Sequence, residues 1–142
     1  PSLTSILRRF FAEALVGQRA GKSASLVHCH AGKDRTGIAV ALVHHILGVH
    51  RDDMMADYLL TNTAGNNEKR IADALAQQAG GGVMAKVPEA AIRVLMNVDA
   101  DFLATALAAI ERRHGTIDVY LEEVLGVDAA ARAALCQHYI EG

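Results

Sequence analysis

The chain has 142 residues, a formal net charge of -2 and 51% hydrophobic residues. These values are typical of a single globular domain and exclude a disordered or fibrous chain. A near-neutral charge argues against nucleic acid as a partner, because nucleic acid selects for a broad excess of Lys and Arg. No apolar run is long enough to span a bilayer, and the first 20 residues carry charges where a signal peptide would be apolar. We therefore expect no stable membrane insertion.

The two cysteines, Cys29 and Cys136, are too few for a disulfide framework. A reactive thiol is easiest to keep reduced in the cytosol, so we expect a cytoplasmic protein, or one secreted without a visible signal. The sequence begins at Pro1, and we expect its N-terminal part to be missing.

The first predicted element is a helix over residues 5–20, followed by Gly21 as a stop signal. The short apolar run over residues 25–28 then predicts a buried strand. A buried strand without a partner leaves its backbone groups unsatisfied. We therefore expect residues 25–29 to pair with backbone that lies outside this chain segment.

Residues 30–37 have the composition of a loop, and residues 38–47 predict a helix that is buried on several sides. Everything downstream is predicted to be helical. The residues that favour helix starts are Asp52 with Asp53, Asn66 or Asn67, Pro88, Asp99, Thr116 and Asp128. Helix ends are indicated by Gly80-Gly81-Gly82, Gly115 and Gly126.

One segment has the pattern of a catalytic anion site: His28-Cys29-His30-Ala31-Gly32-Lys33-Asp34-Arg35-Thr36-Gly37. A tight loop that turns into a helix N-terminus points backbone N–H groups inward, and the helix dipole adds positive charge at the same place. A cysteine at such a cradle is stabilised as a thiolate. Cys29 is therefore the candidate nucleophile for phosphorus.

The other residues of the segment fit this chemistry. The planar guanidinium of Arg35 can hold two phosphoryl oxygens at once. Gly32 and Gly37 permit a close approach of the backbone. The Thr36 hydroxyl can donate to the sulfur and help to expel it in a second step. Lys33 is either a solvated loop charge or a contact for a second anionic group of the substrate.

A metal site would need a different pattern. His28, Cys29 and His30 alternate along the chain, so their side chains point in opposite directions, and no second ligand pair stands at zinc spacing. We expect neither a metal nor another cofactor. The remaining interpretation of Cys29, a buried structural thiol, does not explain the spacing of Arg35 and the glycines.

The segment resembles the loop of the cysteine-dependent protein tyrosine phosphatase superfamily, which reads H-C-x-x-x-x-x-R-[S/T]. The string HCHAGKDRTG is similar to one bacterial branch, that of the mycobacterial protein tyrosine phosphatase B. The resemblance spans most of residues 22–140 and continues in Gly115, Tyr120-Leu121, Leu125-Gly126, Arg132 and Leu135.

The resemblance implies an α/β fold, with a sheet flanked by helices. This chain would supply mainly the helical C-terminal portion and the strand before the phosphate-binding loop. Residues 1–142 would be a catalytic domain that lacks its N-terminal part. A helical lid is expected at about residues 66–97, hinged near Gly80.

The resemblance also implies a phosphomonoester hydrolase with a phosphocysteine intermediate. Its substrates would be phosphotyrosine proteins first, then phosphoserine, phosphothreonine and phosphoinositides. Cys29 and Arg35 would be catalytic, and the phosphate-binding residues would be His30, Ala31, Gly32, Lys33, Asp34, Arg35 and Thr36.

The general acid is not settled by the pattern, since the superfamily takes it from an Asp on a separate loop that this sequence does not reveal. Asp34 is the carboxylate next to the scissile bond, and it either donates the proton or only orients Arg35 or caps the helix.

Two other functions compete with hydrolysis. A phosphate-binding module without turnover would need only the cradle, and the intact Cys29, Arg35 and Thr36 argue against it. Sulfur transfer of the rhodanese kind also uses a cysteine loop, but the Arg-Thr-Gly ending favours phosphate.

Overall fold

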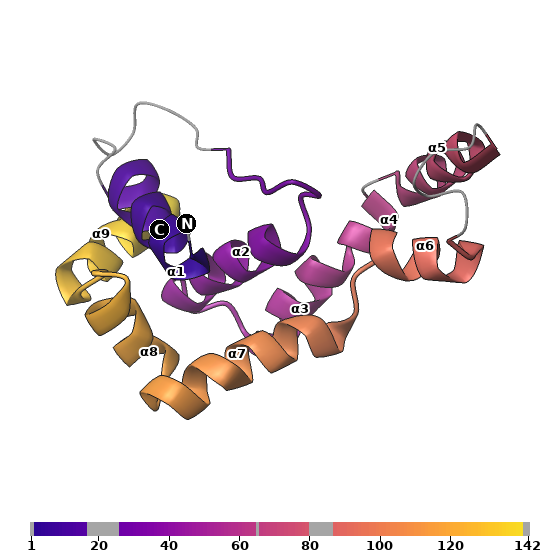
Figure 1. The fold of residues 1–142 in the computed structure, drawn as a ribbon. Helices are drawn as coiled ribbons and strands as arrows, with labels where there is room; N and C mark the ends of the chain where they lie inside the picture. The colour runs from indigo at the N-terminus through magenta and orange to yellow at the C-terminus, as the bar shows by residue number, and fades with distance from the viewer. Residues whose placement is uncertain (1, 17–25, 65, 80–86, 141–142) are drawn as a thin grey trace.

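The computed structural model describes residues 2–16, 26–64, 66–79 and 87–140, and every regular element in these ranges is helical (Figure 1). In chain order the elements are α1 (Leu3–Arg9), the π-helix η1 (Phe10–Val16), α2 (Asp34–Ile46), α3 (Arg51–Leu59), α4 (Thr61–Ala64), α5 (Asn67–Ala79), α6 (Glu89–Met96), α7 (Ala100–His114), α8 (Ile117–Val119), the π-helix η2 (Tyr120–Val124) and α9 (Ala129–Tyr139). The expected α/β fold is therefore wrong, because the described residues hold no sheet for the helices to flank.

The predicted strand is the source of this error. Residues 26–29 adopt no regular secondary structure, and residue 25 lies outside the described ranges. Hydrogen bonds to a neighbouring strand are what stabilise a strand, and the described residues contain no second strand to provide them. Leu26, expected to be buried, is 89% exposed. The pairing of residues 25–29 with backbone outside the chain segment stays a prediction.

Most helices pack around one apolar core. Helix α7 runs along the molecule, and both α2 and α3 lie against it (Figure 1). The largest fully buried side chains of this core are Leu7, Phe11, Leu42, Leu103, Leu107, Leu121, Leu125 and Val127. We call the elements that share this core, α1, η1, α2, α3, α7, α8, η2 and α9, the helical body. Their packing holds α2, whose first turn carries the candidate site.

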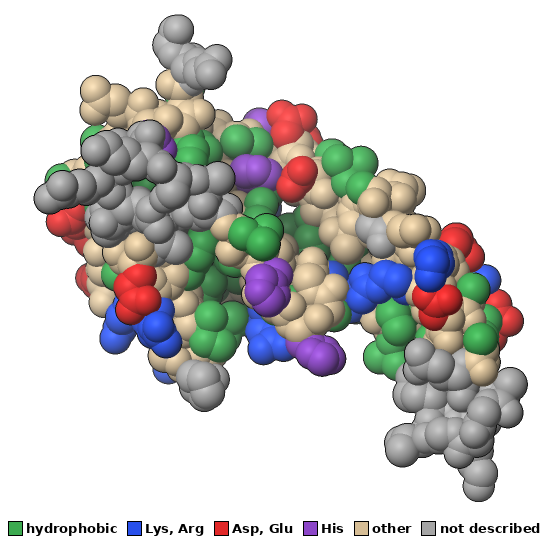
Figure 2. Space-filling model, turned by 90° about the horizontal axis from the view of Figure 1, so that it is seen from above, with side chains coloured by type: hydrophobic (Ala, Val, Ile, Leu, Met, Phe, Trp, Pro, Cys, Tyr) green, Lys and Arg blue, Asp and Glu red, His purple; other side chains and the backbone are tan. Residues whose placement is uncertain are grey.

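Helices α5 and α6 form a hairpin that projects from the body (Figure 1). It has its own small apolar contact, since Ile71 and Ile92 are buried but do not belong to the main core. Figure 2 shows basic and acidic side chains intermixed at this end of the molecule, where Arg93 pairs with Glu68 and Glu89. The expected lid over residues 66–97 corresponds to this hairpin, whose role as a lid stays a prediction. The proposed hinge near Gly80 lies outside the described residues.

Several predicted helix boundaries are confirmed by their caps. The side chains of Asp99, Thr116 and Asp128 each accept a backbone hydrogen bond from the first turn of α7, α8 and α9, respectively. Gly115 ends α7 with a φ of 86°, a conformation that favours glycine. The helix predicted over residues 5–20 is present as α1 and η1 up to Val16, and residues 17–20 lie outside the described ranges.

Two helix starts differ from the prediction. Helix α2 begins at Asp34 rather than at residue 38, so the second half of the expected loop is helical. Helix α6 begins at Glu89, and Pro88 is its N-cap residue rather than its first helical residue. Among the helices that the structure describes, none combines the length and the apolar character needed to cross a bilayer.

Candidate active site

The loop over residues 29–33 leads directly into the first turn of α2. Gly32 has a φ of 72° and Lys33 is the N-cap residue of the helix. The Cys29 N–H donates to Thr36 Oγ1 at 2.9 Å, which ties the beginning of the loop to the first turn of α2. The first N–H groups of a helix have no partner within the helix, and they carry the positive end of its dipole. The loop therefore places Cys29 where an anion is stabilised.

The electrostatic environment of Cys29 favours the thiolate. Burial alone raises the pKa of the thiol. Hydrogen bonds from the Thr36 hydroxyl and from the backbone N–H groups of Thr36, Gly32 and Lys33 outweigh it and lower the pKa from 9.0 to about 6. The ionised sulfur is therefore the main form at neutral pH, as a nucleophile requires.

Arg35 lies on the side of α2 that faces α1. With Cys29 it lines a cavity of about 120 Å³ whose other walls are mostly apolar and include Leu3, Phe10 and Val27. Its side chain is exposed. An exposed guanidinium group that lines the same cavity as Cys29 is available to bind an oxyanion.

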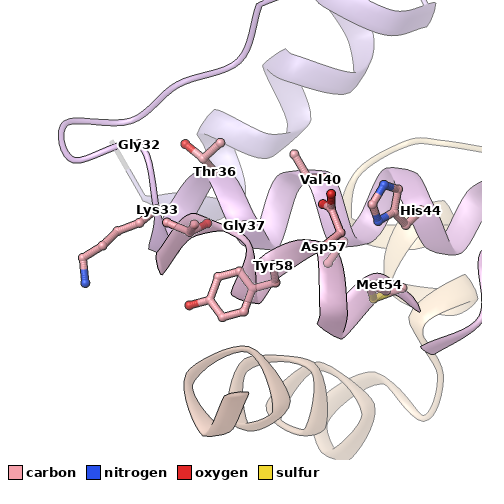
Figure 3. Close-up of a pocket in the computed structure, with 11 residues that line it drawn as sticks. Gly32, Lys33, Thr36, Gly37, Val40, His44, Met54, Asp57 and Tyr58 are labelled. Atoms are coloured by element: carbon pink, nitrogen blue, oxygen red, sulfur yellow. The ribbon is translucent and has the colours of Figure 1, made fainter. Parts of the chain in front are cut away.

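Lys33 is placed differently from the two residues that flank it. Its side chain is only 10% exposed, and its Nζ donates to the carbonyl oxygen of Asn97 at 2.9 Å. The same Nζ lies 3.3 Å from Asp34 Oδ2. Figure 3 shows Lys33 reaching outward from the start of α2 on the side away from Thr36. The ammonium group is thus engaged by the protein, and its contact with a second substrate anion stays a prediction.

The other predicted phosphate-binding residues lie along the same loop. His30 is exposed and Ala31 is partly buried. The Asp34 side chain is 51% exposed and makes its ion pair with Lys33 rather than with Arg35. Of the predicted residues, Gly32, Lys33 and Thr36 contact the Cys29 sulfur, through their backbone N–H groups and the Thr36 hydroxyl.

A second cavity, of about 80 Å³, is lined by residues of α2 and α3 (Figure 3). Tyr58 of α3 packs against Gly37, where an added Cβ would lie 2.5 Å from the tyrosine ring. Burial raises the pKa of Tyr58, and the carboxylates of Asp34 and Asp99 raise it further. The sequence pattern did not reveal this contact of Tyr58, although Gly37 was already marked for close approach.

Two residues of the site were missed by sequence reasoning. Asn97 is joined to Lys33 across 64 positions, and Asp57 lines the same cavity as Tyr58. Neither stands near the loop in the sequence, so no local spacing could reveal them. Within the described residues, no group of three or more His, Cys, Asp or Glu side chains is arranged to hold a metal ion.

Comparisons with known proteins agree with the loop geometry. A family model described as the tyrosine phosphatase family matches residues 3–141. The chain is 39% identical, over 95% of its length, to a candidate tyrosine-protein phosphatase of Cupriavidus necator, and this match covers 46% of that protein. It is 35% identical, over 69% of its length, to the triple specificity protein phosphatase PtpB of Mycobacterium tuberculosis, with 37% of that protein covered.

The match confirms the resemblance that the sequence indicated, including its bacterial branch. The chain spans less than half the length of both relatives. Because the family match runs through the loop, α2 and all the helices that follow, the chain belongs to the tyrosine phosphatase family.

Proposed function

We propose that this chain carries the site of a phosphomonoester hydrolase in which Cys29 is the nucleophile. The observation that supports the proposal most is the lowered pKa of Cys29, about 6, beside the N-terminus of α2. A thiol that serves only to fill the core does not need the four hydrogen-bond donors that stabilise the ionised sulfur here. Family membership agrees with this chemistry.

The reaction would proceed in two displacements. First, the Cys29 sulfur attacks phosphorus, an S–P bond forms, and the bond from phosphorus to the ester oxygen breaks with its electron pair on that oxygen, which takes up a proton. Water then attacks phosphorus, the S–P bond breaks, and inorganic phosphate leaves as the thiolate is restored. Thr36 would stabilise the departing sulfur, as its hydroxyl already does in the free site.

The phosphoryl oxygens would be held by the loop. The proposed binding residues are His30, Ala31, Gly32, Lys33, Asp34, Arg35 and Thr36, and α2 contributes the positive end of its dipole. Arg35 would clamp two oxygens through its planar guanidinium. These interactions stabilise charge that is spread over the transferring group in the transition state.

Phosphotyrosine proteins are the proposed first substrates, with phosphoserine, phosphothreonine and phosphoinositides as further ones. The printed name of the mycobacterial relative, a triple specificity phosphatase, supports the wider range. A cytoplasmic location is also proposed, because a reducing compartment protects a thiolate from oxidation. Since the matches cover only 46% and 37% of these relatives, these proposals concern the complete gene product.

The test compares two cysteine variants of the complete gene product. Cys29→Ser should lower hydrolysis of a phosphotyrosine peptide more than about a hundredfold and still bind inorganic phosphate, because the donors remain without the thiolate. Cys136→Ser is the matched control, since Cys136 lies on α9 and donates to the Ile46 carbonyl, away from the loop. A Cys29→Ser variant with near-parental activity would contradict the covalent mechanism. Phosphate binding without turnover in the parent would instead show a binding module.

We further propose Asp34 as the general acid. Lys33 lies 3.3 Å from its carboxylate, and half of the side chain is open to an incoming substrate. Asp34→Asn should slow hydrolysis of an aryl phosphate with a basic leaving group at least about tenfold, and leave one with an acidic leaving group nearly unchanged. Equal losses on both esters would show that Asp34 only orients the loop.

A further inference from the structure

The connection from α6 to α7 is held by two asparagine side chains from a distant part of the chain. Asn62 of α4 donates from Nδ2 to the Val98 carbonyl at 2.9 Å and accepts from the Val98 N–H at 2.8 Å. Both halves of its amide are thereby satisfied by the backbone of one residue. This pair of bonds fixes the backbone immediately after Asn97.

Asn67 holds the same connection from the other side. It is 3% exposed, and its Nδ2 donates to the carbonyls of Thr61 and Met96 and to Asn97 Oδ1 at 3.0 to 3.3 Å. Residues 96–98 are thus tied to α4 and to the start of α5. The position of the Asn97 carbonyl follows from these contacts.

Lys33 is the link between this connection and the phosphate loop. Its Nζ donates to the Asn97 carbonyl and lies 3.3 Å from the carboxylate of the neighbouring Asp34. A buried ammonium group is costly unless it is hydrogen-bonded, so the fixed carbonyl determines where the Lys33 side chain can lie. Lys33 is also the N-cap residue of α2, and its φ and ψ of -120° and -75° are held without a side-chain cap.

We propose that Asn62, Asn67 and the Asn97 carbonyl form a latch that holds Lys33, and through it the phosphate loop, in the shape that directs the loop N–H groups at Cys29. Asn62 and Asn67 are positioning residues, because they act through Lys33 and do not touch the sulfur. The latch deepens the proposed phosphatase function and rests on it for its effect on turnover. Its effect on the thiol does not depend on any substrate.

The latch also joins the site to the α5–α6 hairpin. Asn67 is the first residue of α5, and Met96 is the last residue of α6. A hairpin movement that pulls residues 96–98 away from Asn62 would therefore release Lys33. The loop N–H groups would then lose their alignment, and the thiol would become a weaker acid.

The test follows the ionisation of Cys29 in the complete gene product through the pH dependence of its alkylation by iodoacetamide. The parent should show a midpoint near 6, the pKa of Cys29 in this loop. Asn62→Ala removes no charge, yet it should raise the midpoint by about one pH unit, which lowers the thiolate fraction at pH 6 about fivefold. Lys33→Met should do the same, and the double variant should add little to the larger single effect.

Thr63→Ala is the matched control. Thr63 follows Asn62 on α4, is exposed, and donates only to the Leu60 carbonyl of its own turn. It should keep the parental midpoint. Asn62→Ser provides a second neutral variant whose fold is checked by circular dichroism beside the first, so that a loss of structure is not mistaken for a loss of the latch.

Each outcome decides between the latch and its alternatives. A raised midpoint in Lys33→Met with parental midpoints in folded Asn62→Ala and Asn62→Ser would overturn the latch, since Lys33 would then act only as a nearby charge. A parent with a midpoint near 6 that hydrolyses no phosphomonoester would overturn the proposed function and leave the latch standing.

Discussion

The helical body and the α5–α6 hairpin are stabilised by different means. The body buries a continuous set of apolar side chains from α1 to α9, including Leu42 of α2. The hairpin buries Ile71 and Ile92 outside that set, and the ion pairs described on it, such as Lys69 with Asp73, are exposed. Exposed ion pairs contribute little to stability, because water screens them and holding the side chains costs entropy.

This difference separates the two supports of the active site. Cys29 and Thr36 rest on α2, which the main core holds firmly. Lys33 rests on residues 96–98, which are held by Val98 in the main core and by polar contacts with Asn62 of α4 and Asn67, the first residue of the hairpin. Local opening of the hairpin would therefore reach the support of Lys33 through Asn67 and Met96, and not the support that carries the nucleophile.

The largest expected effect on stability comes from deleting one fully buried side chain in each of the two regions. Leu42→Ala should lower the free energy of global unfolding by about 2–5 kcal/mol, because both the transfer of apolar surface and the remaining cavity are unfavourable. Ile92→Ala deletes a side chain that is equally buried. Its main effect should be local opening of the hairpin. Urea denaturation should show a smaller loss of the free energy of global unfolding, and amide exchange in α5 and α6 should become faster.

Val94→Ala is the control for this pair, since Val94 lies on α6 and is 64% exposed. It should leave both measurements nearly unchanged. If Ile92→Ala lowers the global stability as much as Leu42→Ala does, the hairpin unfolds together with the body and the distinction between the two regions fails.

A smaller effect is expected at the contact between α2 and α3. Gly37→Ala should cost about 1–3 kcal/mol, because the new methyl group would meet the ring of Tyr58, which is only 5% exposed. In a Tyr58→Leu background the same substitution should cost clearly less. Denaturation of the four proteins of this cycle measures the coupling, and an unchanged cost would show that the tyrosine ring is not what excludes a side chain at Gly37.

Much of the site could be predicted from local sequence, because its main parts lie within eight residues. The spacing of Cys29 and Thr36 across a glycine-containing loop predicted a cysteine at a helix N-terminus, and the structure has this arrangement. The caps at Thr116 and Asp128 were equally local, since a cap side chain bonds the backbone of its own first turn.

The remaining features depend on residues far apart in the chain. The run over residues 25–28 carries a local preference for a strand, but a strand forms only with a partner, and none lies in the described residues. Asn66 or Asn67 was predicted as a cap, whereas the buried amide of Asn67 donates to the carbonyls of Thr61 and Met96. Lys33 was expected either to be a solvated loop charge or to meet a second substrate anion, and its contact with Asn97 has no signal in the local pattern.

The central claim is that the Cys29 thiolate takes up the phosphoryl group. The most direct measurement is rapid acid quenching of the complete gene product during turnover of a phosphotyrosine peptide, followed by mass spectrometry of its cysteine peptides. The account predicts a phosphoryl group on the sulfur of Cys29, none on Cys136, and its loss in Cys29→Ser. Turnover that proceeds without phosphorylated Cys29 at any quench time, or a phosphoryl group on another residue, would contradict it.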